Sequence, residues 1–150
     1  MDTFSSVDQA LQFAIDREQE AADFYSSLAE RATAPGMKDV FMGFAAQETK
    51  HKNKLLAVKQ GGDLQPSAQK VVDLQVSDYL AEVTANDDMD LQAALTLAMQ
   101  REKMAFKLYS DLAASASGEL RETFLALAQE EAGHKVRLEI IYDDQILTDN

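Results

Sequence analysis

The sequence predicts an all-α fold, a four-helix bundle made of two antiparallel helical hairpins joined by a long crossover. Three observations predict it. Hydrophobic residues recur at helical spacing in four long segments. Only 2 prolines and 6 glycines occur among the 150 residues, so little of the chain is barred from helix. The second half of the chain also repeats the residue pattern of the first.

A first hairpin is expected over residues 7–60. Its first helix covers residues 7–31, where Ser6 is a suitable N-cap that begins a capping box. Its second helix covers residues 38–60 and ends at a Gly-Gly pair, a common helix stop. Because only a few residues around Pro35 separate the two helices, we expect them to be antiparallel neighbours.

A second hairpin is expected over residues 89–143. One helix covers residues 90–114, and the next follows Ser117, which is a suitable N-cap. The crossover, residues 61–88, is long for a compact domain, and we expect a short helix in it near residues 78–83. Two short turns and one long crossover describe a single domain that takes in all 150 residues.

The two hairpins repeat each other in sequence. Moving the first helix forward by 84 positions, or the second by 83, superposes many identical residues. Those that recur are Ala10, Leu11, Ala14, Arg17, Glu18, Ala21, Tyr25, Ser26, Leu28 and Ala29, followed by Phe41, Ala45, Glu48, His51, Lys52 and Leu55. The chain therefore reads as a duplicated hairpin, and two such hairpins packed face to face would build any central site twice.

The two histidines of the chain occur in the same short motif. His51 follows Glu48 by three residues, and His134 follows Glu131 by three residues. Residues three apart on a helix project from the same face, so one metal ion can meet both side chains. The second helix of each hairpin therefore offers a Glu-x-x-His pair of candidate ligands.

The other two helices each supply one more carboxylate at equivalent positions, Glu18 and Glu102. Each is followed seven residues later by a tyrosine, Tyr25 or Tyr109, which lies on the same face two turns along. The neighbours of both glutamates on that face are apolar or small, and a charge among such residues is costly unless it is paired or metal-bound. Together with the two Glu-x-x-His motifs, they form the ligand set of a carboxylate-bridged two-metal centre in a bundle core.

Composition excludes several classes of function. A formal net charge of −12 argues against nucleic acid or anionic membrane as a partner. With 0 Cys, the chain holds no disulfide, thiolate nucleophile, iron–sulfur cluster or Cys-ligated zinc. No basic or apolar leader follows Met1, and no apolar run approaches the length of a membrane span. We therefore expect a soluble, cytoplasmic protein.

These motifs make the chain resemble the di-iron domain of the rubrerythrin family, within the ferritin-like superfamily. The matching pieces cover nearly the whole chain outside the crossover, and they are Arg17-Glu18 to Tyr25, Glu48 to His51, Arg101-Glu102 to Tyr109, and Gln129-Glu130-Glu131 to His134. The resemblance implies a ferritin-like four-helix bundle that holds two metal ions.

The resemblance also implies a role for each matching residue. The implied metal ligands are Glu18, Glu48, His51, Glu102, Glu131 and His134. The glutamate of each Glu-x-x-His would bridge the two metals, each histidine would be an end ligand, and the other two glutamates would be terminal ligands. The implied hydrogen-bond partners of the ligand carboxylates are Tyr25 and Tyr109.

The resemblance implies a non-haem di-iron oxidoreductase that reduces peroxide or dioxygen in oxidative-stress defence, with two iron ions and a separate electron donor protein. Manganese and zinc also suit the mixed carboxylate and imidazole ligands. The chain departs from the family in having no Cys for a rubredoxin-like domain, and in having Ala105 where a further carboxylate is usual. Two alternatives are a ferroxidase that handles or stores iron and a non-enzymatic metal-binding bundle.

Other features have simpler interpretations. Met42, Met99 and Met104 are expected to pack in the core rather than to bind metal. Glu20 and Glu130 should point away from the candidate ligands and lie on the surface. Because two similar hairpins could exchange between chains at little cost, a homodimer is expected.

Overall fold

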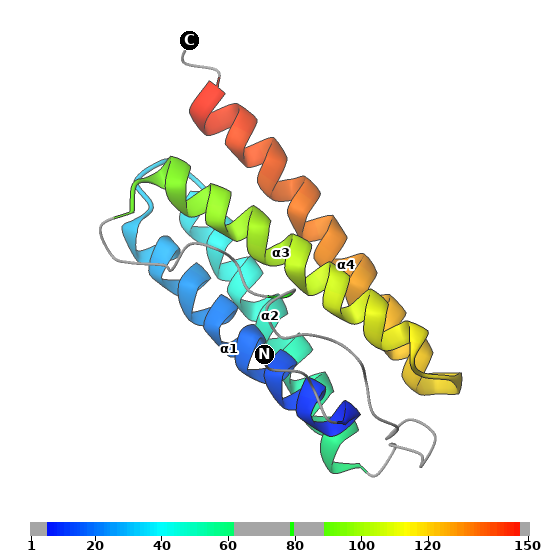
Figure 1. Cartoon of the computed structure of the whole chain (residues 1–150). Coiled ribbons are helices and arrows are strands. Elements are labelled where there is room, and N and C mark those ends of the chain that lie inside the picture. Colours follow the sequence, from blue (N-terminus) through cyan, green and yellow to red (C-terminus); the bar gives the residue numbers. More distant parts are fainter. Residues whose placement is uncertain (1–5, 62–78, 80–88, 148–150) are drawn as a thin grey trace. The chain divides into compact units, whose positions relative to one another are not determined.

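A computed structural model describes residues 6–61, 79 and 89–147 of the chain (Figure 1). All regular structure in these residues is helical, and no strand occurs among them. The elements are α1 (Val7–Arg31), α2 (Met37–Gln60), α3 (Leu91–Ala114), α4 (Gly118–Tyr142) and the π-helix η2 (Asp143–Leu147). The chain divides into two compact units, one with the hairpin of α1 and α2 and the other with the hairpin of α3 and α4.

The first hairpin begins with a side-chain cap. The Ser6 Oγ accepts a hydrogen bond from the backbone N–H of Gln9 at 3.2 Å. This bond satisfies one of the backbone N–H groups in the first turn of α1 that have no partner within the helix. The helix then runs to Arg31, over the residues that the hydrophobic period predicts. Its buried residues recur every three or four positions along one face.

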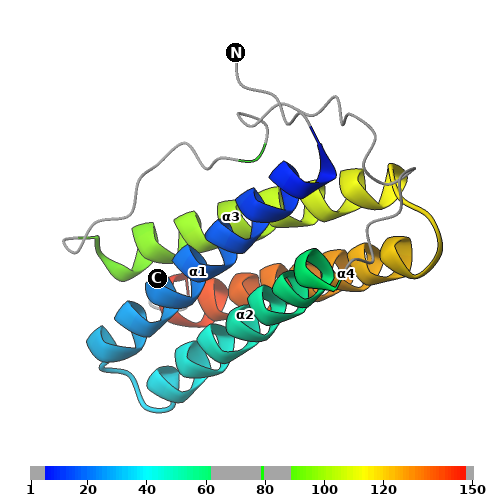
Figure 2. The same ribbon diagram turned by 90° about the horizontal axis from the view of Figure 1, so that it is seen from below.

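The turn between α1 and α2 depends on a glycine. Gly36 has φ 80°, a left-handed conformation that favours glycine, and it caps α2 without a side-chain hydrogen bond. The helix begins at Met37, one residue before the predicted start. Figures 1 and 2 show α1 and α2 side by side in opposite directions. Their polar edge is joined where the Lys52 Nζ donates to the Gln19 Oε1 at 2.6 Å.

The second hairpin follows the same plan. The Asp90 carboxylate accepts a hydrogen bond from the N–H of Ala93 at 2.7 Å and caps α3, while Ser117 precedes α4 without a side-chain cap bond. The helices α3 and α4 pack on each other in opposite directions (Figure 2). The Gln92 Nε2 donates to the Tyr142 hydroxyl at 2.9 Å and joins the start of α3 to the end of α4.

One residue of the predicted crossover, Tyr79, is described. Its side chain is buried, and its hydroxyl donates to the Asp111 Oδ2 of α3 at 2.8 Å. The Lys107 Nζ lies 3.1 Å from the same oxygen and 5.0 Å from the centre of the Tyr79 ring. The crossover is thus held to α3 at this point. The short helix expected near residues 78–83 otherwise lies outside the described residues.

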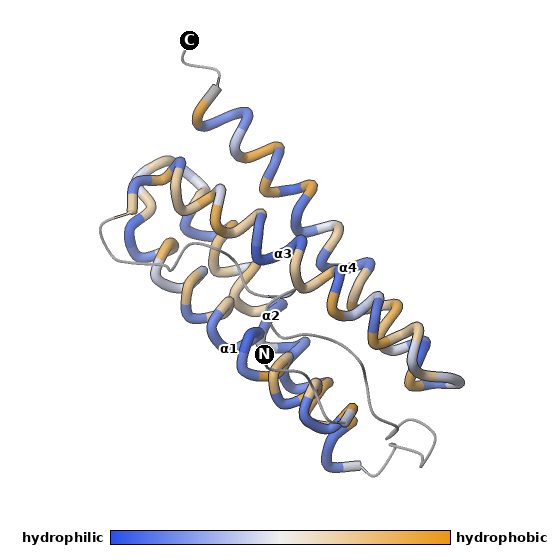
Figure 3. The backbone as a smooth tube through the Cα atoms, viewed as in Figure 1, coloured by the Kyte–Doolittle hydropathy of each residue, from blue (hydrophilic) through white to orange (hydrophobic). Residues whose placement is uncertain are grey.

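Hydrophobic and hydrophilic residues alternate along every helix, as amphipathic helices require (Figure 3). The prediction that Met42 packs in the core is wrong, because its side chain is 49% exposed. The adjacent Phe41 occupies the inward position of this turn and is buried, which turns Met42 outward. Met99 and Met104 of α3 are half-buried. No helix in the described part of the chain is both long and apolar enough to cross a membrane.

Candidate metal centre

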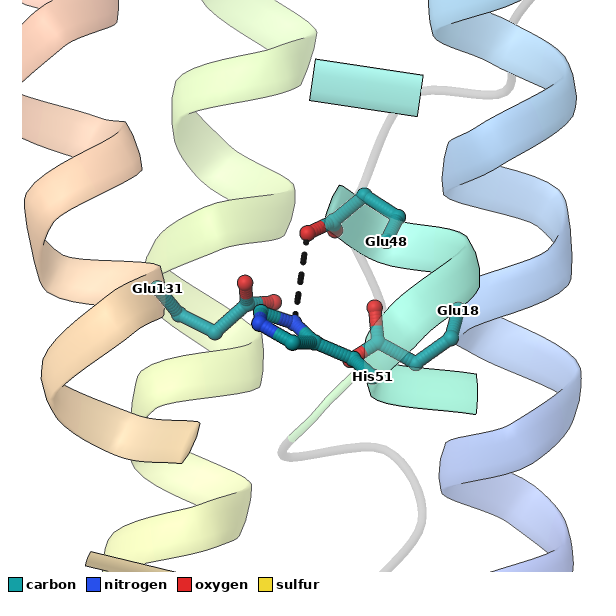
Figure 4. Close-up of side chains that lie close together, drawn as sticks. All are labelled: Glu18, Glu48, His51 and Glu131. Atoms are coloured by element: carbon teal, nitrogen blue, oxygen red, sulfur yellow. Dashed lines mark ion pairs between the residues drawn. The ribbon is translucent and has the colours of Figure 1, made fainter. Parts of the chain in front are cut away.

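Three candidate ligands meet in the first hairpin. Glu18 comes from α1, whereas Glu48 and His51 come from α2, and all three are at most 4% exposed. The His51 Nδ1 lies 3.3 Å from the Glu18 Oε2 and 3.4 Å from the Glu48 Oε1. Figure 4 shows these side chains turned toward one another; Glu131, also labelled there, belongs to α4 and to the other hairpin. We call Glu18, Glu48 and His51 the first triad.

The second hairpin contains the equivalent group. Glu102 comes from α3, whereas Glu131 and His134 come from α4, and all three are at most 3% exposed. The His134 Nδ1 lies 3.5 Å from the Glu102 Oε2 and 3.2 Å from the Glu131 Oε1. We call these residues the second triad. Within each hairpin, the structure therefore brings together three of the six residues that the sequence singles out as candidate metal ligands.

Helical periodicity explains how each triad forms. The Glu and His of one helix are three residues apart and project from the same face toward the neighbouring helix. Antiparallel packing then brings the middle of α1 beside the middle of α2, and the middle of α3 beside the middle of α4. Each third ligand thus reaches the other two from a separate helix.

The spacing of the donor atoms fits a bound metal ion. Two ligands that each lie about 2.1 Å from one ion are themselves about 3 to 3.5 Å apart. The four imidazole-to-carboxylate separations in the triads, 3.2 to 3.5 Å, fall in this range. Each triad has one ligand atom per residue within 4.8 Å of the others. Imidazole nitrogen and carboxylate oxygen suit iron, manganese or zinc.

Charge balance points the same way. Each triad holds two carboxylates and one histidine, so even a protonated histidine would leave one negative charge uncompensated among the three. Burial makes such a charge costly, because water no longer solvates it. A divalent cation in each triad would remove this cost while using donor atoms that already face one another.

Neighbouring acidic residues are kept apart from the first triad. The Arg17 Nη2 lies 2.8 Å from the Glu20 Oε1, and its guanidinium sits 4.9 Å from the centre of the Phe13 ring. The Glu20 side chain is 52% exposed. Glu20 therefore lies on the surface, as predicted, and so does Glu130 of α4. Both serve as natural controls for the buried glutamates beside them.

The two tyrosines implicated by the sequence are both buried, at 1% exposure each. The Tyr25 ring stacks on Phe44 of α2, with centroids 5.1 Å apart and planes 26° apart. Phe44 was not singled out by sequence reasoning, although its place four residues before Glu48 puts it on the same face. Leu127 of α4 holds the position equivalent to Phe44, so the duplication differs here.

Comparison with known families gives one match over most of the chain. The model of the rubrerythrin family matches residues 9–142. This range contains both triads and all four α-helices except the first two residues of α1. No curated protein matches the chain significantly.

Two solved structures are similar to this chain. One, from Thermotoga maritima, is described as a ferritin-like diiron-carboxylate protein; it is 20% identical, with a TM-score of 0.79 over 97% of this chain and 99% of that one. The other is a hypothetical protein from Pyrococcus furiosus, 26% identical, with a TM-score of 0.70 over 92% of this chain and 89% of that one. The fold is thus the ferritin-like four-helix bundle that the sequence predicts.

Proposed function

This chain belongs to the rubrerythrin family, and from that premise we propose that it is a two-metal oxidoreductase that reduces peroxide or dioxygen. The observation that carries the proposal is the occurrence of a buried Glu–Glu–His triad in each of two duplicated hairpins. A single such group could be a structural accident, but two in matching register indicate a function that needs a pair of sites.

The residues that would hold the metals are those of the two triads. We propose that Glu18, Glu48 and His51 supply one set of ligands, and that Glu102, Glu131 and His134 supply the other. Six donors with four negative charges match two divalent ions. The assignment of Glu48 and Glu131 as bridging ligands, and of iron as the metal, stays a prediction from the family.

Two bound ferrous ions would supply the electrons and the Lewis acidity for reduction of the oxidant. The protein contributes position and protection. Placing every ligand near the middle of a long helix keeps the donor atoms fixed, since neither helix end nor loop is involved. Burial of all six side chains keeps bulk water from the metals.

Tyr25 and Tyr109 are proposed to act beside the ligands rather than as ligands. A buried tyrosine hydroxyl can donate one hydrogen bond, and a ligand carboxylate is the acceptor expected on the same helix face. Stacking on Phe44 fixes the ring of Tyr25. A tyrosine held in this way would orient a carboxylate and hold a proton close to the reacting oxidant.

The proposal includes partners. Reduction of the oxidant consumes electrons, and the chain has no Cys with which to bind a rubredoxin-type iron. We therefore propose that a separate protein delivers electrons, and we keep the cytoplasm as the expected compartment. A homodimer remains the expected assembly.

Anaerobic loading with ferrous iron followed by elemental analysis tests the proposal. We expect two metal ions per chain, because the two triads offer two sets of ligands. One ion or none would contradict it. The surface variant Glu20→Ala should retain the full content, whereas Glu18→Ala and Glu102→Ala should each lose metal.

Stopped-flow mixing of the loaded protein with peroxide or dioxygen then identifies the oxidant. Faster oxidation by peroxide supports a peroxidase. Oxidation only by dioxygen, with growth of a mineral in a large particle, would replace the proposal with iron storage. Two bound metals that react with neither oxidant would leave a structural metal clamp as the function.

A further inference from the structure

The outer face of α2 carries positive charge that no acidic residue on the same face balances. From Met42 to Ala57 the exposed residues of this helix include Lys50 and Lys54 but no Asp or Glu, since the one acidic residue of the stretch, Glu48, is buried. The whole chain, by contrast, has a formal net charge of −12. We call the exposed residues of α2 from Met42 to Ala57 the α2 face.

The duplicated helix α4 provides an internal comparison. Its equivalent stretch, residues 125–140, exposes two acidic residues, Glu130 and Glu139, and one basic residue, Arg137. Both helices carry a Glu-x-x-His pair on the buried side, so the metal centre does not account for the difference in charge between the two exposed sides. The positive charge is therefore particular to α2.

The four lysines in the second half of α2 divide into two pairs. The Nζ atoms of Lys52 and Lys59 donate to glutamine side chains of α1, at 2.6 and 2.5 Å, so both of these lysines are turned toward the neighbouring helix. Lys50 and Lys54 are exposed, and they make no hydrogen bond or ion pair with any residue that the structure describes. Four residues apart on one side of a helix, they repel each other, and an acidic partner would remove this repulsion.

The α2 face lies directly behind the first triad. The Glu48 and His51 side chains leave α2 on the side of the triad (Figure 4). Lys50 follows Glu48 by two residues, and two residues along a helix lead to its opposite side. The α2 face is therefore separated from these ligands by the thickness of one helix, about 10 to 12 Å. A redox protein bound there would have a short path to the metals through the helix that holds two of their ligands.

We propose that the α2 face is the docking surface for an acidic electron donor protein, an inference that rests on the proposed function. Opposite charges speed the encounter of two proteins and orient them. Met42, which is 49% exposed, supplies a side chain of a type that is enriched at protein interfaces. Each encounter passes one electron from the reduced donor to the oxidised metal pair and leaves the donor oxidised by one electron. Two encounters return the two electrons that the oxidant removes.

A small protein fits this surface better than an extended polyanion does. Nucleic acid or an anionic membrane would reach beyond the α2 face onto the neighbouring helix α1, where Asp8, Asp16 and Asp23 are exposed and would repel it. A small acidic protein can contact the lysines of the α2 face without meeting these carboxylates. Charge complementarity thus favours a compact acidic partner.

Isothermal titration calorimetry with an acidic rubredoxin as the probe tests the inference on the full chain, both iron-loaded and metal-free. Wild-type protein should bind the probe at low ionic strength, and about 1 M salt should abolish binding because the Debye length falls to about 3 Å. The double variant Lys50→Glu/Lys54→Glu should weaken binding at least about tenfold. Stopped-flow reduction of the oxidised, iron-loaded variant by reduced rubredoxin should slow by a similar factor, whereas its metal content should not change.

Two further double variants serve as controls. Lys103→Glu/Arg121→Glu makes the same change of net charge at exposed positions of the second hairpin, and it should alter binding by less than about twofold. Lys50→Arg/Lys54→Arg keeps the charge of the α2 face and should bind as the wild type does.

The outcomes separate this inference from the proposed function. No binding of the probe by the wild type, equal weakening by the Lys103→Glu/Arg121→Glu control, or binding of phosphatidylglycerol vesicles in place of the probe would each overturn the docking surface. Two bound metals that react with peroxide in a protein whose reduction ignores the charge of the α2 face would overturn it too, while leaving the proposed function intact. Lysine-dependent binding of the probe by a chain that holds no metal would contradict the proposed function and support the docking surface.

Discussion

Glu18 and Tyr25 in α1 recur as Glu102 and Tyr109 in α3, and all four side chains are buried. On the outer faces of the same two helices, Asp16, Glu20 and Asp23 of α1 become Gln100, Met104 and Lys107 of α3. These three acidic residues of α1 thus have no acidic counterpart on α3. Identity is kept at these buried positions and lost at these outer positions.

This difference separates the positions that the proposed metal centre needs from those that it does not. A metal centre needs donor atoms at set separations, so the inner positions cannot vary independently. Outer positions face only water and can vary, as the change from Asp23 in α1 to Lys107 in α3 shows. Between these extremes lies the pair of Phe44 and Leu127, equivalent core positions that hold an aromatic residue in one hairpin and an aliphatic residue in the other.

The largest effect is expected from the histidines. Substituting a residue that hydrogen-bonds to a metal ligand typically lowers metal affinity or activity by about 10- to 100-fold. Substituting a ligand itself should cost at least as much, so His51→Ala and His134→Ala should each slow ferrous oxidation by at least about 100-fold. The two losses should be similar, and the double variant should add little, because a pair of metals acts as a unit. Stopped-flow kinetics of iron-loaded protein provides the measurement.

Glu20→Ala is the matched control for this comparison, since Glu20 pairs with Arg17 at the surface two residues from Glu18. It should leave the rate of oxidation unchanged. If Glu20→Ala abolished oxidation while Glu18→Ala did not, the first triad would be wrongly assigned. If only one histidine mattered, the two hairpins would not be equivalent in function.

Removal of metal should destabilise the protein. Each triad buries two carboxylates beside one histidine, and they repel each other when no cation is present. A metal present at 100 times its dissociation constant stabilises the native state by about 2.7 kcal/mol per site, which corresponds to about 5 to 10 °C in a domain of this size. Differential scanning calorimetry of apo and loaded protein measures the shift. Coincident melting curves would show that the triads bind no metal.

The helix bounds and the Glu-x-x-His pairs could be predicted from the sequence because they depend on local sequence patterns. The hydrophobic period, together with the cap at Ser6 for α1, predicted the bounds of α1 and α3 to within a residue, and the Glu-x-x-His spacing requires only helix geometry. Met42 could not be placed, since Phe41 beside it is also apolar and periodicity does not decide which of two neighbours turns inward. The hydrogen bond from Tyr79 to Asp111 could not be predicted from periodicity, because it joins the crossover to a helix.

Phe44→Leu tests whether the core difference between the hairpins matters, because it gives the first hairpin the residue found in the second. Losing the stacked pair with Tyr25 should lower the free energy of unfolding by about 1 to 2 kcal/mol. Phe41→Leu, an equally buried change without that stacking, is the control. Equal losses in urea denaturation would mean that stacking on Tyr25 contributes nothing beyond burial.

The smallest effects concern helix caps, where the hairpins agree again. Positions 6 and 90 are equivalent, and the Ser6 Oγ and the Asp90 Oδ1 each accept a hydrogen bond from the backbone N–H three residues later, at 3.2 and 2.7 Å. Ser6→Ala should therefore lower the free energy of unfolding by about 1 kcal/mol. Asp90→Ala should cost somewhat more, since its negative charge also interacts with the N-terminal end of the helix dipole. Ser117→Ala is the control, because Ser117 makes no side-chain cap bond to α4, and it should change stability by less than about 0.5 kcal/mol. Urea denaturation of the three variants gives the order. A loss at Ser117 as large as that at Ser6 would mean that the cap bonds do not set the stability of the helix starts.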